Sequence, residues 1–573
     1  MAVTTAAQSN DQAAIQWLRQ HAIPIQTVEA GNGFADLQPL KKVVGDARIV
    51  ELGEATHGTR EFFQLKHRMI EFLASEKGFT IFSIEANMPE AYRLNDFVLN
   101  GFGDPKQLLK GMYFWTWNTE EVLDMILWMR EFNKSGRGRI EFTGFDMQTP
   151  TVSMEILRKF VNLKDQSYFD ATLNPLYDEV SRMTGQQQPG FGVATATLPL
   201  QVAAGKHVTL RGYIKSENVA DGYAGLWMRI DHAKGEAKPF ALDNMYDRGI
   251  TGTTPWKRYE ISMDVPANAT NINFGALNTG SGTAWFDSLA IEINGVPYTE
   301  NNTVDLDFES STPRGFYTAG QGYEIALDNT VAQSGKQSLR MKRITPPQTA
   351  ASEKDSAASL IQKCNEVVKY LKANRSVYLK AGSTSQQIDW VIQNARLVLQ
   401  YAQLKSGTKS RDESMAENIQ WIADQNPGAK LIVWAHNGHI SNSGYSGTAS
   451  MGSYLRKTYG DQLVNFGFAF NEGSFRAWEI GIGLHDFTVG PGPEGSLDRT
   501  LGAVKIPIFA VDLRQLPMEG PVAQWFKQPH ASRSVGSAYS DTLAPNLWSP
   551  GPSNLDFDAL LFVENTTAAR PNP

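Results

Sequence analysis

The chain has 573 residues, of which 42% are hydrophobic and 20% are charged, and its formal net charge is −7. This length predicts two or three domains, and the composition is ordinary for a globular protein. The acidic balance argues against nucleic acid as a partner, because no basic excess can neutralise phosphates, and the lack of a run of about 18 apolar residues argues against a membrane span.

The first part of the chain alternates between helices and apolar strands. Helices are predicted at residues 11–20, 60–76, 87–98 and 120–132, strands at 48–52, 79–85 and 139–146, and a loop at 101–113. Three β–α repeats with short connections predict a parallel sheet covered by helices. Residues 1–10 lack the features of a signal peptide, which indicates a cytoplasmic protein or an exported one whose signal has been removed.

One residue stands out on the helix predicted at 60–76. When successive residues are placed 100° apart, Lys66 falls in the middle of an arc of phenylalanine, leucine, methionine and isoleucine side chains. A lysine facing a core is costly unless it is paired or reaches a wet cleft. Two interpretations stay open: Lys66 extends along the edge of the core to solvent, or it belongs to a polar site. Thr59 is the expected N-cap of this helix.

The pattern changes after about residue 185. Residues 184–190 have the composition of a linker, and short strands at 208–214, 225–230, 256–265 and 283–291 predict an all-β sandwich. Segments 254–260 and 285–289 look like strands of carbohydrate-binding jelly rolls. Segments 307–309 and 334–339 look like the start of such a domain, although in this sequence they come after the segments that look like its end. Trp256 and Trp285 could stack on sugar rings, but a place in a core or interface is favoured.

Helices and strands alternate again after about residue 356. Helices are predicted at 360–371, 386–404 and 413–424, the last capped by Asp412, and strands at 430–435, 463–470, 506–512 and 559–563. The single cysteine, Cys364, is interpreted as a small core residue. We therefore predict an α/β domain with a mostly parallel sheet, made of residues 1–185 and 351–573 and split by an inserted β-sandwich of jelly-roll type at 186–350.

Acids and imidazoles gather just past the predicted strands of the α/β domain. These residues are Glu54, His57, Glu85, Asp146, His436 and His439. Because the carboxyl ends of parallel strands meet at the same edge of a sheet, we expect these side chains to converge. An active site at this edge is favoured over coincidence.

Two chemistries fit such a set. In one, an imidazole acts as general base on water, carboxylates hold its tautomer, and a cation or second imidazole stabilises an oxyanion. In the other, Glu54, His57, Glu85 and His436 bind a divalent metal that activates water. The spacings do not distinguish the two. A serine hydrolase is not supported, because the sequence has no G-x-S-x-G motif.

Several motifs resemble the erythromycin esterase family. They are LGEATHGT at 52–59, EFF at 61–63 with KHR at 66–68, the strand 78–85, GFDMQ at 144–148, RDESMAEN at 411–418, WAHNGH at 434–439 and MG at 451–452 with YLR at 454–456. The resemblance covers both halves of the α/β domain. It implies a bacterial carboxylic ester hydrolase without a cofactor, acting through water, whose substrate in the best-known members is the macrolactone of 14-membered macrolides such as erythromycin.

The resemblance also assigns roles to residues. The proposed general base of the family falls on His57, and the acid three residues earlier falls on Glu54. The acid that ends the second strand falls on Glu85, and the imidazoles of the later motif fall on His436 and His439. All five are therefore expected to be catalytic.

A basic residue on the first helix of the family, arginine in some members, falls on Lys66 and is expected to be catalytic as well. Asp146, Arg68 and Met415 are assigned to substrate binding. Other members resemble proteins of exopolysaccharide biosynthesis, which keeps open a hydrolase of another ester or a polysaccharide-related substrate, and a carbohydrate-binding protein of exopolysaccharide assembly. A glycan at the insert would suit either a glycosylated macrolide or a polysaccharide.

Overall fold

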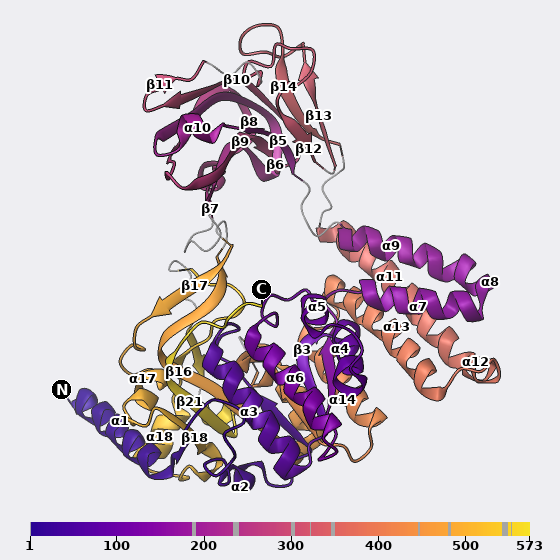
Figure 1. The fold of residues 1–573 in the computed structure, drawn as a ribbon, viewed down its shortest axis with the longest axis vertical. Coiled ribbons are helices and arrows are strands. Elements are labelled where there is room, and N and C mark those ends of the chain that lie inside the picture. The colour runs from indigo at the N-terminus through magenta and orange to yellow at the C-terminus, as the bar shows by residue number, and fades with distance from the viewer. Residues whose placement is uncertain are drawn as a thin grey trace. The chain divides into compact units, whose positions relative to one another are not determined.

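The structure is a computed structural model. It describes residues 2–185, 191–232, 240–299, 304–320, 322–344, 350–444, 447–479, 483–540, 548–551 and 553–572, so residues 186–190 of the predicted linker lie outside the described part. The chain divides into two compact units, and each is described by itself (Figure 1). The main unit comprises Met1–Ser181, Lys354–Ile480 and Leu484–Pro573, and the insert unit comprises Arg182–Glu353 and Gly481–Gly483.

In the described residues, a nine-stranded sheet forms the centre of the main unit. Its order is β1 (Ile23–Pro24), β18 (Ile508–Asp512), β21 (Ala559–Thr566), β16 (Leu463–Glu479), β2 (Ile49–Leu52), β15 (Leu431–Trp434), β3 (Ile81–Asn87) and β4 (Glu141–Asp146), with β17 (Gly483–Val489) paired to β16. The strands from β21 to β4 are parallel, whereas β18 and β1 add antiparallel pairs at one edge. The predicted parallel sheet flanked by helices is confirmed.

Helices cover both faces of this sheet (Figure 1). Helices α2 (Leu40–Val44), α3 (Arg60–Lys77), α4 (Met88–Asn100) and α6 (Glu120–Lys134) enclose one core. The other face packs on α13 (Ser385–Ser406), α14 (Arg411–Gln425) and α16 (Met451–Tyr459) at one end. At the other end it packs on α1 (Ala2–His21), α17 (Leu497–Gly502) and α18 (Pro521–Lys527). The central strands are therefore buried on both faces, which explains their continuous apolar runs.

The remaining described elements of the main unit are shorter or lie at its periphery. They are α5 (Pro105–Lys110), α7 (Thr151–Lys164), α8 (Gln166–Tyr168), α9 (Asn174–Gly185), α11 (Ala350–Ala373), α12 (Arg375–Lys380), α15 (Asn437–Ile440), α19 (Ser553–Asp556) and a hairpin of β19 (His530–Arg533) with β20 (Trp548–Gly551). The loop predicted at 101–113 thus contains α5, whose N-cap Asp104 accepts a hydrogen bond from the backbone of Lys106.

Helix α3 is buried on almost every side. Its apolar residues are shielded from solvent as predicted, and Lys66 among them is 0% exposed. The polar arc opposite, which includes His67 and Arg68, is buried too. Gly78 ends the helix in the left-handed conformation (φ 72°) that glycine adopts at little cost. Thr59 stands at the N-cap, but its hydroxyl bonds that of Thr56 instead of capping the helix.

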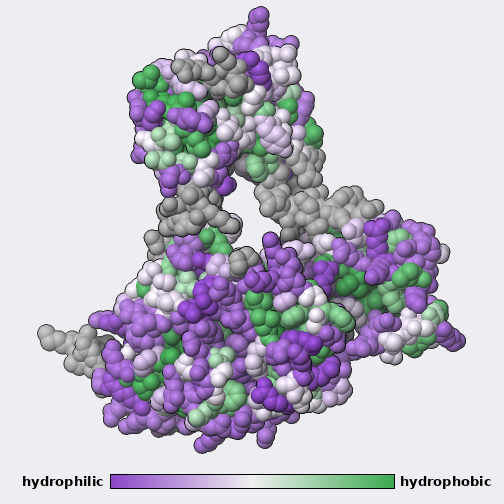
Figure 2. Space-filling model, in the orientation of Figure 1, coloured by the Kyte–Doolittle hydropathy of each residue, from purple (hydrophilic) through white to green (hydrophobic). Residues whose placement is uncertain are grey.

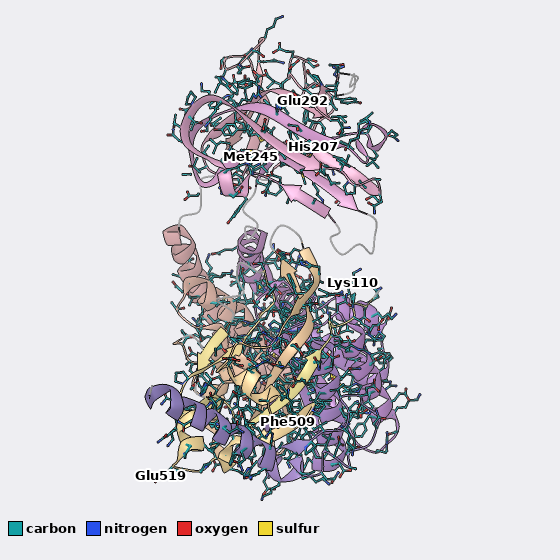
Figure 3. The ribbon with its side chains drawn as sticks, turned by 90° about the vertical axis from the view of Figure 1, so that its left-hand side faces the viewer. Lys110, His207, Met245, Glu292, Phe509 and Glu519 are labelled. Carbon is teal, nitrogen blue, oxygen red and sulfur yellow. The ribbon has the colours of Figure 1, made fainter. Side chains whose placement is uncertain are left out.

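The insert unit consists mainly of strands, as predicted, with the short helix α10 (Leu200–Ala203) between β5 (Gly192–Thr197) and β6 (His207–His232). Its described strands form an antiparallel sheet in the order β12 (Tyr317–Ala319), β5, β9 (Ala269–Asn278), β6, β10 (Thr283–Ile293), β14 (Ser338–Arg343) and β13 (Tyr323–Asp328). Strands β7 (Phe240–Asp243) and β8 (Ile250–Asp264) pair with β6, and β11 (Val296–Pro297) pairs with β10. Figure 3 shows His207, Met245 and Glu292 within this unit. Its classification as a jelly roll stays a prediction.

The two tryptophans singled out in the insert occupy different surroundings. Trp285 is 6% exposed, and its Nε1 donates to Asp328 at 2.8 Å, so this ring is not free to stack on a ligand. Trp256 lies on β8 and is half-buried.

No described helix is long and apolar enough to cross a membrane. On the face drawn in Figure 2, hydrophilic residues cover most of the main unit and apolar residues lie in small groups between them. This distribution is normal for a protein surface in water.

Candidate active site

The strand order places the predicted residues at one edge of the main sheet. Strand β15 comes from the chain beyond the insert and lies between β2 and β3 in parallel register. Glu54 and His57 therefore follow the strand on one side of His436, and Glu85 lies near the end of the strand on the other side, two residues before Asn87. Residues almost four hundred positions apart in sequence meet at the carboxyl ends of three neighbouring strands, as ligand sites in such sheets do.

Close backbone packing holds the loop that leaves β2. The backbone N–H of Asn437 donates to the carbonyl of Glu54 at 2.9 Å, and the Asn437 side chain bridges to Phe468. A Cβ on Gly53 would lie 2.1 Å from Oδ1 of Asn437, so only glycine fits there. The carbonyl of Gly58 accepts backbone hydrogen bonds from two later segments of the chain. These contacts fix the loop between Glu54 and His57.

Glu54 is completely buried and accepts three hydrogen bonds. Its Oε1 accepts a hydrogen bond from Nδ1 of His57 at 2.6 Å. Its Oε2 accepts hydrogen bonds from Nζ of Lys66 at 2.6 Å and from Nε1 of Trp434 at 2.8 Å. Burial raises the pKa of Glu54, but Lys66 and the bonded His57 outweigh it and lower the pKa to about 2. Glu54 is therefore a carboxylate at neutral pH and can only accept hydrogen bonds.

This carboxylate determines the tautomer of His57. Because Glu54 cannot donate, Nδ1 of His57 carries the proton of their hydrogen bond, and in the neutral ring Nε2 holds the free lone pair. The His57 side chain is 12% exposed. Its ring lies edge-on to Trp117 and 5.1 Å from the ring of His436, measured between centroids.

His436 is neutral and presents an unused donor. Its Nδ1 accepts the backbone N–H of Gly438 at 3.1 Å, so the proton of the neutral ring is on Nε2. That Nε2 is buried and has no hydrogen-bond partner among the described residues. Burial and the neighbouring imidazoles of His57 and His439 lower the pKa of His436 to about 3. A buried polar group without a partner in a polar site is a candidate for contact with substrate.

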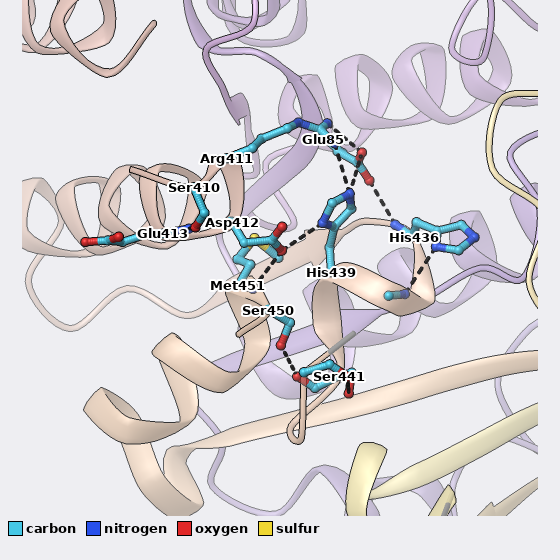
Figure 4. A network of polar contacts seen from close by, with 12 residues as sticks. Glu85, Ser410, Arg411, Asp412, Glu413, His436, His439, Ser441, Ser450 and Met451 are labelled. Carbon is cyan, nitrogen blue, oxygen red and sulfur yellow. Dashed lines mark hydrogen bonds and ion pairs between the residues drawn. The ribbon is translucent and has the colours of Figure 1, made fainter. Parts of the chain in front are cut away.

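Glu85 connects His436 to a second group of charges (Figure 4). Its Oε2 accepts the backbone N–H of His436 at 2.9 Å, and its Oε1 accepts Nη2 of Arg411 at 2.7 Å. Arg411 also binds Asp146 through Nε and Nη2, at 3.2 and 2.7 Å. Burial raises the pKa of Glu85, but His439 and Arg411 outweigh it and hold the pKa well below its usual range.

His439 lies between two carboxylates in the same group. Its Nδ1 is 2.8 Å from Oδ1 of Asp412, and its Nε2 is 3.4 Å from Oε1 of Glu85. Burial lowers the pKa of His439, but these carboxylates outweigh it and raise the pKa to about 9. Nη1 of Arg411 is 3.0 Å from Nε2 of His439, a contact that becomes a hydrogen bond only when the ring is neutral.

Two predicted site residues lie outside the converging groups, and a third holds Arg411. Arg68 points into the loop before β2, where it binds both oxygens of Asp36 and two backbone carbonyls. Met415 is 0% exposed in the core formed by α14 and the sheet. Asp146 is 0% exposed and holds Arg411. The structure gives Arg68 and Met415 structural roles instead of places among the converging groups, because their side chains leave α3 and α14 on sides away from Glu54 and His57.

The structure also adds residues for which no site role was predicted. Arg411 and Trp434 belong to motifs of the family resemblance and make direct hydrogen bonds to Glu85 and Glu54. Asp412 was expected to cap α14, but Ser410 is the cap and Asp412 binds His439. The sequence signal for a site role was the pair of charged residues, Arg411 and Asp412, directly before the predicted helix. An N-cap was the simpler interpretation of Asp412.

The converging residues do not suit a divalent metal. All the oxygens of Glu54 and Glu85 already accept hydrogen bonds, several of them from the cations Lys66 and Arg411. Nδ1 of His57 and Nδ1 of His436 are engaged as well. A metal ion would have to displace these cations. Among the described residues, no group of three or more histidine, cysteine and acidic side chains is arranged to hold a metal ion.

Comparisons with known proteins find similar sequences. The family model described as erythromycin esterase matches residues 74–209 and 325–566, more than half of the chain. Erythromycin esterase type II from Escherichia coli is 32% identical over 158 residues, which are 26% of this chain and 36% of that protein. The chain thus spans less than two thirds of the length of the curated relatives it matches.

Solved structures show a similar fold. A protein from Bacillus cereus has a TM-score of 0.61 at 19% identity, over 98% of this chain and 99% of that one. A mutant of the erythromycin esterase EreC in its open conformation has a TM-score of 0.50 at 12% identity, over 93% and 94% of the two chains. At these identities the likeness concerns the fold alone.

Proposed function

The chain belongs to the erythromycin esterase family, and from this premise we propose that it hydrolyses the macrolactone of a 14-membered macrolide such as erythromycin and so inactivates the antibiotic. Family membership supports a hydrolase. The ester and the macrolide are inferred from the family and its named relative. The observation that supports the chemistry best is the pair of imidazoles at the sheet edge, one with a free lone pair and one with a free N–H.

His57 is the general base in this proposal. Its Nε2 takes a proton from a water molecule that attacks the ester carbonyl, while Nδ1–H stays bonded to Glu54. The ring then becomes an imidazolium beside the carboxylate of Glu54, which stabilises the new positive charge. When the tetrahedral intermediate collapses, the same Nε2 returns the proton to the departing alkoxide. The products are a carboxylic acid and an alcohol.

His436 supplies the donor for the developing oxyanion. Its Nε2–H is buried, unpartnered and carried by a ring that stays neutral at neutral pH. Such a donor needs no rearrangement when negative charge appears on the carbonyl oxygen, and removal of a donor of this kind costs roughly 100- to 1000-fold in kcat. Glu85 holds the backbone of His436 in place by accepting a hydrogen bond from its N–H. Arg411, which also binds Asp146, holds Glu85.

Mass spectrometry tests this proposal. Wild-type protein incubated with erythromycin should convert it to a product heavier by one water molecule, whereas His57→Ala should lower the rate at least about 100-fold. The matched control is His67→Ala, because His67 is a buried histidine on α3 outside the cluster. Equal conversion by wild type and His57→Ala would sink the assignment of the base.

Metal-free chemistry is part of the proposal, because the cations Lys66 and Arg411 occupy the places next to the carboxylates. Treatment with a chelator, followed by metal analysis of the protein, should leave the rate of hydrolysis unchanged. Activity that is lost with the metal and returns when metal is added would favour the metal-dependent alternative.

We also propose a glycan as partner of the insert unit, on the sheet face that carries Trp227. The register of β6 and β9 places Trp227 opposite Gly275 and Arg229 opposite Asn273, while the alternate residues form the core of this unit. Nε1 of Trp227 is buried and has no hydrogen-bond partner in the described residues. An indole next to guanidinium and amide groups suits the apolar face and the hydroxyls of a sugar ring.

Binding to a glycan array tests this second proposal. The whole protein should bind a subset of glycans, and Trp227→Ala should abolish that binding. Tyr246→Ala is the control, because Tyr246 is an aromatic residue of the same unit that is 78% exposed. Binding that survives in Trp227→Ala, or no binding by wild type, would reject this face as a glycan site.

A further inference from the structure

We propose that Lys66 and Trp434 are positioning residues that hold Glu54 in place as an anion, and through it fix the orientation and tautomer of His57. This inference rests on the proposed role of His57 as general base. Lys66 then acts through Glu54 and not on substrate. Trp434, for which the sequence indicated no role, becomes a second positioning residue.

The distribution of donors around Glu54 carries the proposal. Lys66 and Trp434 both donate to Oε2, which leaves Oε1 as the acceptor for Nδ1 of His57. A half-turn of the carboxylate only exchanges two equivalent oxygens, whereas any smaller rotation or shift would weaken all three hydrogen bonds. His57 is therefore held with Nδ1 toward Glu54 and Nε2 away from it, which is the orientation a general base needs.

The polar atoms of both residues are directed at Glu54 and not at an open site. Lys66 and Trp434 are both 0% exposed. Nζ of Lys66 lies 4.3 Å from the centroid of the Trp434 ring and 5.3 Å from that of Phe468. Aromatic faces thus replace water around the ammonium group on the sides that Glu54 does not occupy. The indole acts twice, as a hydrogen-bond donor to the anion and as a π-surface for the cation.

Aromatic packing fixes the indole itself. The ring of Trp434 contacts Phe63 at 5.1 Å and Trp117 at 5.7 Å between centroids. Trp117 in turn lies edge-on to His57 and donates from Nε1 to the backbone carbonyl of Glu85. The two indoles thus connect the loop of His57 with the strand of Glu85 through contacts that have little freedom to move.

The charge of Lys66 makes the arrangement around Glu54 depend on pH. Burial lowers the pKa of Lys66 to about 8, although Glu54 and Glu85 act in the opposite direction. Above about pH 8 the amine loses its charge and Glu54 loses its main counter-ion. An arginine at this position would stay charged at every accessible pH. Replacing Lys66 by arginine should therefore move the alkaline limit of activity upward.

The kinetic test uses four variants of the full-length protein. Trp434→Phe keeps the ring but loses its N–H, and should lower kcat about 10-fold while KM changes less than about 2-fold. Lys66→Met should lower kcat about 100-fold, and Lys66→Arg should recover most of that loss and shift the alkaline limb. Trp525→Phe is the matched control, because buried Trp525 donates from Nε1 to Asp11, outside the site.

A spectroscopic test separates this inference from the proposed function. The ¹⁵N spectrum of histidine side chains, with the His57 signals assigned by their loss in His57→Ala, reports the tautomer without any turnover. Wild type should show Nδ1 protonated. Lys66→Met should show a mixture, because Glu54 loses the counter-ion that keeps it ionised, and Trp434→Phe, which keeps that counter-ion, should show a smaller change in the same direction. An unchanged tautomer in both variants, or equal kcat in Trp434→Phe and wild type, would overturn the inference. Absence of esterase activity with the expected tautomer changes would overturn only the proposed function.

Discussion

Replacing Glu54 by glutamine should reverse the tautomer of His57 without changing the shape of the site. A glutamine side chain offers one oxygen and one NH2 group in the place of two equivalent oxygens. Nε1 of Trp434, 2.8 Å from Oε2, cannot accept a hydrogen bond in any protonation state. The amide oxygen must therefore face Trp434, and the NH2 group faces Nδ1 of His57. Nδ1 then has to accept, the proton moves to Nε2, and the lone pair of the base is lost.

The size of this effect follows from the cost of the opposite orientation. Turning the amide over would leave the buried N–H of Trp434 unsatisfied and would place an NH2 group against it, at a cost of about 1–3 kcal/mol for each buried group left unpaired. With two such groups, roughly 2–6 kcal/mol separates the orientations. Since about 1.4 kcal/mol corresponds to a factor of 10, kcat of Glu54→Gln should fall roughly 30- to 20,000-fold.

The assay is steady-state ester hydrolysis by Glu54→Gln and by the double variant Glu54→Gln/Trp434→Phe. Removing the indole N–H takes away one of the two donors that hold the amide oxygen, while Lys66 remains, so the double variant should recover part of the activity that Glu54→Gln loses. Far-UV circular dichroism checks that both fold. The reasoning is refuted if Glu54→Gln keeps kcat within 10-fold of wild type, or if the losses of the two single variants simply multiply.

Three further predictions concern the surroundings of the site. Arg411→Lys should lower kcat about 10- to 100-fold, because a single ammonium cannot serve Glu85 and Asp146 together as the guanidinium does; unchanged kinetics would contradict this. Glu90 is 1% exposed, and its Oε2 has no partner in the described residues. Burial raises its pKa from 4.5 to about 7. The wild type therefore loses stability as the pH rises from the pKa of the unfolded chain, near 4.5, through the pKa of the folded protein, about 7. In denaturant titrations the free energy of unfolding of Glu90→Gln should therefore exceed that of wild type by up to about 3 kcal/mol at pH 8 and by little at pH 4.5. A difference in this free energy that does not vary with pH would count against the prediction. Gly53→Ala should destabilise the protein by about 1–3 kcal/mol and lower kcat, because its Cβ would overlap the Asn437 side chain; a variant with wild-type stability and kcat would show that the loop has room to adjust.

The sequence predicted what depends on local patterns. Apolar runs marked the strands of the main sheet, because strands buried on both faces carry few polar residues. Lys66 was noticeable because a single charge interrupted an apolar helical face. The acids and imidazoles at strand ends were found for the same reason, since each follows an apolar run directly.

Features that depend on contacts between distant segments could not be predicted in this way. No local pattern shows that β15 lies between β2 and β3, because that order depends on strand pairing across the whole insert. Arg68 adjoins the site residues in sequence, yet its side chain leaves α3 toward Asp36. Asp412 and Ser410 are both good N-caps by type, and only the position of His439 decides that Asp412 serves the imidazole.

The most direct test of this account is the mass of erythromycin after incubation with wild type and with His57→Ala at equal concentration. The account predicts a gain of one water molecule by ring opening with wild type, and a rate at least about 100-fold lower with a folded His57→Ala protein. No gain with wild type would contradict the proposed substrate, and an equal gain with both proteins would contradict His57 as the base.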